Sequence, residues 1–237
     1  MVIPARVVQR APNVEDQLRM KELTITPRAF MEMDTAEQQK KRGNRRTRVP
    51  EILEVSMRVL ASEGNAGFTQ RRVASDVGIR LSSLQHYFAT REELLQATME
   101  AMFRRFINLY REIARDNRRS PEARMDAIID ETFDELKNSE SYGSAIALEC
   151  WSLAEREPFT RDLMQRVTEE LQEIISGLVA KVNPTLTAGE CSLRGALLVA
   201  QSQGMVVFIR RAGNNAPTAD TLQSATKVVW RAITGAP

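Results

Sequence analysis

The segment TQRRVASDVGIRLSSLQHYF, Thr69 to Phe88, decides the fold of this chain. Thr69 can cap a short helix that carries its apolar residues on one side, namely Val73, Ala74 and Val77. Gly78 supplies a turn, and a second short helix directs Leu84 and Phe88 inward. Two short helices joined at a glycine turn predict a helix-turn-helix, whose second helix enters the DNA major groove.

Helices are also predicted on both sides of this motif. The preceding helix has an apolar stripe made of Ile52, Leu53, Met57 and Leu60. After the motif, Thr90 and Glu93 have the T-x-x-E spacing of a capping box, which predicts a helix from there to about Arg115. The inward stripe of that long helix is Leu95, Met99, Met102, Phe106, Tyr110 and Ile113.

This order of parts resembles the TetR-type regulators, which are dimeric, ligand-responsive repressors. The matching residues are Ile52-Leu53, Gly64, Thr69, Val73-Ala74, Gly78-Ile79, Leu84, Phe88, Arg91-Glu92 and Leu94. The motifs cover about residues 48–96, and beyond them the resemblance rests on the number and order of helices. The resemblance implies an N-terminal three-helix DNA-binding domain and a C-terminal helical domain for ligand binding and dimerisation.

The fold class is predicted to be all-α, because no segment alternates convincingly between apolar and polar residues with a period of two. We expect a flexible basic extension over residues 1–44, a helix-turn-helix DNA-binding domain over residues 45–91, and a ligand-binding and dimerisation domain over residues 92–237. The basic run that closes the extension either follows the DNA backbone or serves as a solubilising tail.

The charge distribution favours a nucleic-acid partner for one part of the chain. Residues 40–91 contain 11 basic and 4 acidic residues, a net charge of +7, whereas the whole chain carries only +2. The remainder therefore carries −5. A basic unit joined to an acidic body is typical of a protein in which only one part meets phosphate.

The second helix of the motif leaves polar side chains for double-stranded DNA. Candidates there are Arg80, Ser82, Ser83, Gln85, His86 and Tyr87. Further candidates around the groove are Arg48, Thr69, Arg71, Arg72 and Arg91, of which Arg91 is expected to bind phosphate at a helix start. By family resemblance Tyr87 occupies a position that often touches phosphate, whereas many members have Tyr at Gln85 and Gly at Ser82.

A small-molecule effector of unknown identity is the second expected partner, because the family's body usually encloses a cavity. The candidate lining is Met102, Phe106, Tyr110, Phe133, Glu149, Trp151 and Met164. Such apolar residues at helical spacing equally suit an ordinary core. Glu149 lies on an inward stripe, so it requires either an internal basic partner or a cationic ligand.

The last two helices are predicted to form a homodimer interface. The first begins at a Thr187–Glu190 capping box and is apolar nearly all round from Ala196 to Ile209. Gly195 and Gly204 would let a second backbone come close. Two such helices from each chain would form a four-helix bundle, and a monomer with a thick core is the alternative.

Other functional classes find little support in the sequence. There is no G-x-S-x-G, no paired Cys/His metal spacing and no glycine loop for phosphate, so neither enzymatic activity nor a cofactor is expected. Cys150 and Cys191 are expected to be reduced, with a redox switch as the alternative. We expect a cytoplasmic protein without a membrane span, since polar residues interrupt the run Leu193 to Ile209. A DNA-architectural or adaptor protein without ligand control remains the functional alternative.

Overall fold

The computed structural model describes residues 27–138, 141–213 and 216–236. These ranges are helical and contain no strand, which confirms the all-α prediction. The chain divides into two compact units, residues 1–48 and residues 49–237.

The first unit corrects one prediction. Helix α2 (Pro27–Gly67) already begins in this unit, whereas we predicted a flexible extension over residues 1–44. Residues 27–48 are rich in Met, Glu, Gln, Lys and Arg, which favour a helix by intrinsic propensity even where no apolar stripe marks one. The part of that prediction that falls on residues 1–26 lies outside the described residues.

The second unit opens with three helices that we call the reading head, residues 49–91. They are the part of α2 from Val49 onward, α3 (Gln70–Val77) and α4 (Leu81–Tyr87). The Thr69 hydroxyl caps α3 by accepting a hydrogen bond from the Arg72 N–H at 3.1 Å, and Gly78 ends the helix with a left-handed φ of 75°. Almost no surface remains exposed on the residues at the centre, which include Ile52, Leu60, Phe68, Val73 and Leu84.

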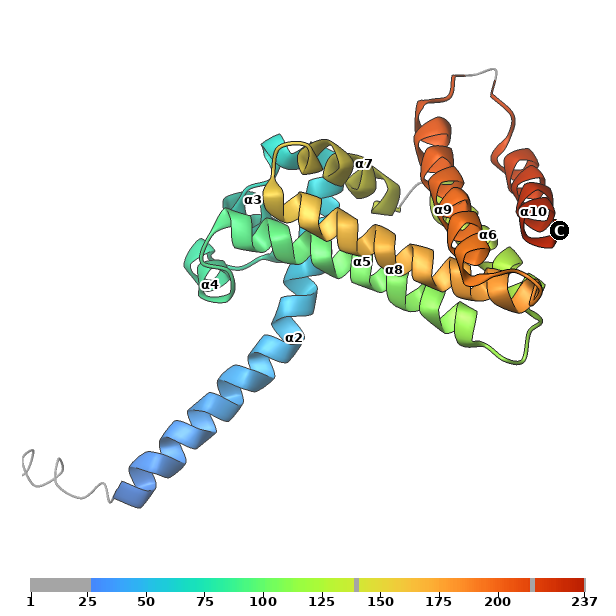
Figure 1. The fold of residues 1–237 in the computed structure, drawn as a ribbon. Helices are drawn as coiled ribbons and strands as arrows, with labels where there is room; N and C mark the ends of the chain where they lie inside the picture. The colour runs from blue at the N-terminus through green and yellow to red at the C-terminus, as the bar shows by residue number, and fades with distance from the viewer. Residues whose placement is uncertain (1–26, 139–140, 214–215, 237) are drawn as a thin grey trace, which may run out of the picture. The chain divides into compact units, whose positions relative to one another are not determined.

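Four helices form the body, and α5 (Arg91–Arg115) and α8 (Pro158–Val182) run side by side along it (Figure 1). Helix α6 (Pro121–Lys137) begins at Ser120, whose hydroxyl accepts from the Ala123 N–H at 3.2 Å. Helix α7 (Gly143–Ala154) lies near the reading-head end of this pair (Figure 1). At the start of α5, Thr90 caps as predicted, but the Glu93 carboxylate accepts from the Ala89 N–H instead of the Thr90 N–H.

Helices α9 (Ala188–Arg211) and α10 (Ala219–Gly235) complete the unit. The predicted capping box at Thr187 and Glu190 is present in both directions. Gly195 is used differently from our prediction, because it faces α8 within the same chain. A Cβ at this position would lie 2.1 Å from the Ser176 Oγ, so only glycine permits this approach of α9 to α8. A Cβ at Gly204, by contrast, would meet open space.

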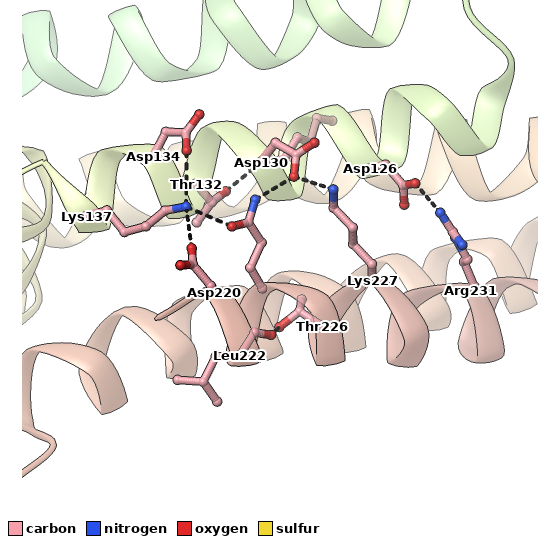
Figure 2. A network of polar contacts seen from close by, with 12 residues as sticks. Asp126, Asp130, Thr132, Asp134, Lys137, Asp220, Leu222, Thr226, Lys227 and Arg231 are labelled. Atoms are coloured by element: carbon pink, nitrogen blue, oxygen red, sulfur yellow. Dashed lines mark hydrogen bonds and ion pairs between the residues drawn. The ribbon is translucent and has the colours of Figure 1, made fainter. Parts of the chain in front are cut away.

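A ladder of polar contacts fixes α10 against α6 (Figure 2). Carboxylates at four-residue spacing on α6 contact the polar face of α10, in the pairs Asp126–Arg231 and Asp130–Lys227. Lys137 donates to Asp220 at 3.1 Å and to the Gln223 side-chain oxygen at 2.9 Å. Because this face of α10 is occupied by α6, apolar residues on another face remain at the surface, with Val228 67% and Val229 39% exposed.

The exposed apolar residues of α9 continue this surface. They are Leu193 at 62%, Leu197 at 52%, Val207 at 41% and Phe208 at 48% exposed. Among the described helices, α9 is one that is long and apolar enough to cross a membrane by length and composition, although the sequence had suggested too short a run. Cys191, Leu198 and Val199 of the same helix nevertheless pack into the core of the body.

The two glycines Gly78 and Gly177 provide a matched test of this backbone description. Gly78→Ala is expected to destabilise the protein by about 1–2 kcal/mol, because a left-handed φ strains a residue with a Cβ. Gly177→Ala, at an exposed position within α8 where a Cβ meets open space, should instead stabilise by about 1 kcal/mol. Urea unfolding measures both, and equal signs for the two variants would contradict the turn at Gly78.

Candidate DNA-reading face and effector cavity

Helix α4 presents most of its polar residues to solvent. Arg80, which precedes the first turn, and Ser82, Ser83, Gln85 and His86 are exposed. Tyr87 is half-buried, and its ring meets the His86 ring edge-on at 5.6 Å. Leu84 is fully buried and Phe88 is 9% exposed, so these two side chains hold α4 against the rest of the head. The arrangement leaves one polar side of α4 available for base edges and phosphates.

Gln70, which was not among our predicted site residues, positions α4, which we call the reading helix. The Gln70 side-chain nitrogen donates to the Phe88 carbonyl oxygen at 2.7 Å, which ties the start of α3 to the end of α4. Its side-chain oxygen accepts a longer hydrogen bond of 3.4 Å from Gln85. Gln70 follows the N-cap Thr69 directly, so its sequence position offers only the local signal of a polar residue in a first helical turn. Its partner eighteen residues away is a tertiary feature.

Arg72, a predicted DNA contact, has ion-pair partners within the chain. Its guanidinium pairs with Glu63 of α2 and donates from Nε to the Asp76 carboxylate at 3.0 Å. These two carboxylates, with the Asp76 hydrogen bond as the largest contribution, raise the pKa of Arg72 above its ordinary value. Arg71 is exposed on the same helix, and Thr69 already accepts the capping hydrogen bond. Arg48, in the first unit, is half-buried.

Arg91, a predicted phosphate contact, has several partners within the chain. Its Nε donates to the Phe68 carbonyl oxygen at 2.7 Å, and its guanidinium also donates to the backbone and side-chain oxygens of Asn65. The guanidinium carbon lies 5.9 Å from the centre of the Phe68 ring. Arg91 therefore clamps the connection between α2 and α3 from the start of α5.

The body contains a cavity of about 130 Å³ with largely apolar walls. An apolar cavity of roughly 150 Å³ admits benzene, so this volume suits a ligand group of similar size. Of the seven predicted lining residues, five are on its wall: Met102, Phe106, Tyr110, Trp151 and Met164. Trp230 of α10 also lines it, so both tryptophans of the chain border the same space.

Two predicted lining residues are located elsewhere. Phe133 is 1% exposed and belongs to the core that joins α6 to α8, α9 and α10. Glu149 turns away from the cavity, and its Oε1 accepts a hydrogen bond from the Asn65 backbone N–H at 2.9 Å. Two residues apart on a helix differ in direction by about 200°, so Trp151 on the cavity wall and Glu149 belong to opposite sides of α7. The observed partner of Glu149 is thus a backbone N–H, whereas we had predicted a basic side chain or a cationic ligand.

Glu135 is the charged group that the sequence analysis missed. Among the described residues that line the cavity it is the only charged one. Its Oε1 accepts from the Gly143 N–H at 2.9 Å and from the Ser141 hydroxyl, at the beginning of α7. No apolar periodicity marks a glutamate as inward-facing, which is why the sequence contained no signal for it.

A hydroxyl pair adds hydrogen-bonding capacity to the same wall. The Tyr110 and Thr132 oxygens are 2.8 Å apart, and Thr132 also donates to the Ile128 carbonyl oxygen at 2.8 Å. Burial raises the pKa of Tyr110 to about 12. The phenol therefore stays protonated and neutral across the physiological pH range.

The described residues contain no group of three or more His, Cys, Asp and Glu side chains placed to hold a metal ion. Cys150 and Cys191 are both buried free thiols. Burial, with a smaller effect of Glu149, raises the pKa of Cys150 to about 12. Because the thiolate is the reactive form, Cys150 has the character of a packed apolar side chain.

Comparisons with known proteins extend these observations. No protein-family model matches the chain. An HTH-type transcriptional regulator BetI from Burkholderia thailandensis is 28% identical over 162 residues, which cover 67% of this chain and 81% of the relative. A regulator of the same name from Burkholderia lata is 27% identical over 159 residues. Both relatives are named as helix-turn-helix regulators, and α3 and α4 of this chain have the arrangement of that motif.

Solved structures show the same fold. A TetR-family regulator structure from Mesorhizobium loti superposes with a TM-score of 0.66 at 12% identity, covering 78% of this chain and 94% of that one. A TetR regulator from Haloarcula marismortui has a TM-score of 0.62 at 19% identity, with coverages of 79% and 96%. The chain is thus similar in sequence to helix-turn-helix transcriptional regulators and in fold to TetR-family regulators. Helices α3 and α4 have the arrangement of a helix-turn-helix.

Arg80 and Arg91 should respond to alanine in different ways. Arg80→Ala is expected to weaken specific DNA binding by about 1–3 kcal/mol without changing thermal stability, because we expect this exposed side chain to contact DNA. Arg91→Ala should lower the free energy of unfolding by about 1–3 kcal/mol, since it removes charged donors from Phe68 and Asn65. Fluorescence anisotropy on selected DNA and urea unfolding measure the two effects. A normal stability for Arg91→Ala would contradict the clamp.

Proposed function

We propose that this protein is a TetR-type regulator, a homodimeric repressor that binds a palindromic operator and is released from it by a small-molecule effector. The observation that carries the proposal is the combination of a polar reading helix with an apolar cavity in the same chain. A protein of this kind acts where the chromosome is, in the cytoplasm. An architectural protein would need the first feature and would have no use for the second.

The apolar surface of α9 and α10 supports the dimer. Leu193, Leu197, Phe208 and Val228 are between 48% and 67% exposed, so a large apolar area of one chain faces water. Apolar patches of this kind in a protein that carries out its function in water mark interaction sites. A second copy of the same two helices covers the surface with a two-fold symmetric bundle.

The dimer then sets the form of the operator. Two identical reading heads related by a two-fold axis recognise two identical half-sites, about one DNA turn or slightly more apart. Selection of bound DNA from a random pool tests this directly. An enriched palindrome supports the regulator, whereas binding that ignores sequence would favour the architectural alternative.

The cavity indicates the chemistry of the effector. Its walls are apolar and aromatic, and its one charged lining residue is the acidic Glu135. An anionic ligand would be repelled there, whereas a cation gains both the carboxylate and the faces of Trp151 and Tyr110. We therefore propose a compact aromatic or aliphatic effector that carries one cationic or hydrogen-bond-donating group.

Release follows from a preference of the effector for one conformation. A ligand that binds both conformations equally changes nothing, however tightly it binds. A hundredfold preference for the released conformation corresponds to about 2.7 kcal/mol, which empties most operators that are only moderately occupied.

The dimer interface can be tested with two substitutions on the same helix. Leu197→Asp is expected to give monomers and to abolish tight operator binding, because it buries a charge in the proposed interface. Gly189→Asp, in the exposed first turn of α9, is the control and should leave the dimer intact. Sedimentation velocity distinguishes the two. A wild-type protein that sediments as a monomer at micromolar concentration would refute the interface.

The effector chemistry can be tested with benzylammonium, benzyl alcohol and benzoate, three probes of similar size. Benzylammonium and benzyl alcohol are expected to quench or shift the fluorescence of Trp151 and Trp230, and benzoate is not. Glu135→Gln should weaken benzylammonium at least about tenfold and benzyl alcohol little, because a buried ion pair loses its charge. Equal binding of all three probes would remove the proposed role of Glu135.

A further inference from the structure

We propose that α7 is the element that couples the effector cavity to the reading head, with Glu149 and Tyr142 as its two attachment points. The proposal deepens the proposed function, because it states how occupancy of that cavity reaches the DNA-reading helices. It rests on the division of α7 into two sides. Residues Ala147 and Trp151 line the cavity, and each is about 200° around the helix from Glu149. Tyr142 and Glu149, seven residues apart, share the other side.

The first attachment is at the end of α2. Gly64 interrupts the helix with φ 64° and ψ −175°. The next N–H, that of Asn65, donates to the Glu149 Oε1 at 2.9 Å. Asn65 also accepts two hydrogen bonds from Arg91, through its backbone and side-chain oxygens. This short segment is therefore held from α7 and from α5 at the same time, directly before the turn into α3.

The second attachment is at the start of α7. The Tyr142 hydroxyl donates to Glu54 of α2, and Arg105 of α5 has its guanidinium 3.8 Å from the same carboxylate. Burial raises the pKa of Tyr142 to about 12, so the hydroxyl stays protonated and able to donate. Glu54 and Asn65 are eleven residues apart on the reading head. Two separated contacts transmit a rotation of α7 as well as a translation, which a single contact would not.

The cavity side of α7 has little freedom to adjust. Gly143 is buried, and a Cβ added there would lie 2.4 Å from the Glu135 Oε1 and 2.6 Å from the Phe106 ring. Glu135 and Phe106 both line the cavity, and Glu135 also holds the beginning of α7 through the Gly143 N–H. A ligand that competes for this carboxylate, or that presses on Trp151, must therefore displace α7. The displacement reaches Glu54 and Asn65 through their hydrogen bonds.

Gly143→Ala provides a wedge that imitates this displacement without a ligand. The added methyl group should move α7 and speed the amide hydrogen exchange of the reading helix, residues 81–88, by about fivefold. Gly177→Ala is the matched control, because a Cβ there meets open space on α8, and it should leave that exchange unchanged. Ala147→Leu, on the cavity face of α7, is a second wedge in case the first variant fails to fold.

The decisive measurement repeats the wedge in a chain that carries Glu149→Ala and Tyr142→Phe. With both attachments removed, Gly143→Ala should no longer change the exchange of residues 81–88. Restoring position 149 as Gln, whose side-chain oxygen still accepts from the Asn65 N–H, should restore part of the effect. An equal wedge effect with and without the attachments would overturn the proposal, and so would a wedge that perturbs α7 and leaves the reading helix unchanged.

This experiment can fail independently of the proposed function. Probe binding, followed by tryptophan fluorescence, tests whether the cavity accepts an effector. The wedge cycle contains no ligand and tests only the mechanical connection. A bound probe with an unchanged wedge effect would leave the effector site intact and remove α7 as the link.

Discussion

The break of α2 at Gly64 is the constraint on which the arrangement of the reading head depends. A helix that stops inside a protein leaves backbone donors and acceptors that need new partners. Here the Asn65 N–H finds the Glu149 carboxylate, and the Asn65 and Phe68 carbonyl oxygens find Arg91. The satisfaction of one backbone interruption thus joins three parts of the second unit: the end of α2, the start of α5 and the middle of α7.

The same interruption gives structural partners to Arg91 and Glu149, two charged residues for which the sequence suggested binding roles. A guanidinium at the start of α5 suits a phosphate, and a carboxylate on an inward stripe suits a cationic ligand. Both instead satisfy backbone groups of residues 65–68, for which unmet hydrogen bonds would cost about 1–3 kcal/mol each. Arg80 at the start of α4, by contrast, is exposed, and its charge is available for a contact with DNA.

Helices α9 and α10 each have one side packed against the rest of the chain and another side exposed to solvent. The polar side of α10 is fixed by carboxylates of α6 (Figure 2). Helix α9 approaches α8 at Gly195. Intrachain contacts thus determine the orientation of both helices about their axes. That orientation in turn determines which apolar side chains remain exposed. Because Trp230 of α10 also borders the cavity, this helix contributes both to the cavity wall and to the exposed apolar surface.

The local signals of the sequence were sufficient for the elements and their ends. The caps at Thr69 and Thr187 and the turn at Gly78 depend on residues within a few positions of one another. The all-α class followed from the lack of period-two alternation. The predicted stripe of α5 was correct only in part, since Met99 and Met102 are buried whereas Leu94, Phe103 and Ile107 take the place of its other members. The early start of α2 was not predicted, because residues 27–48 favour a helix by intrinsic propensity but have no apolar stripe to mark it. Contacts between distant residues were beyond such signals. Only the tertiary structure decided that Arg91 and Glu149 meet Asn65, that Glu135 borders the cavity and that Phe133 does not, because these depend on how whole helices are rotated against each other.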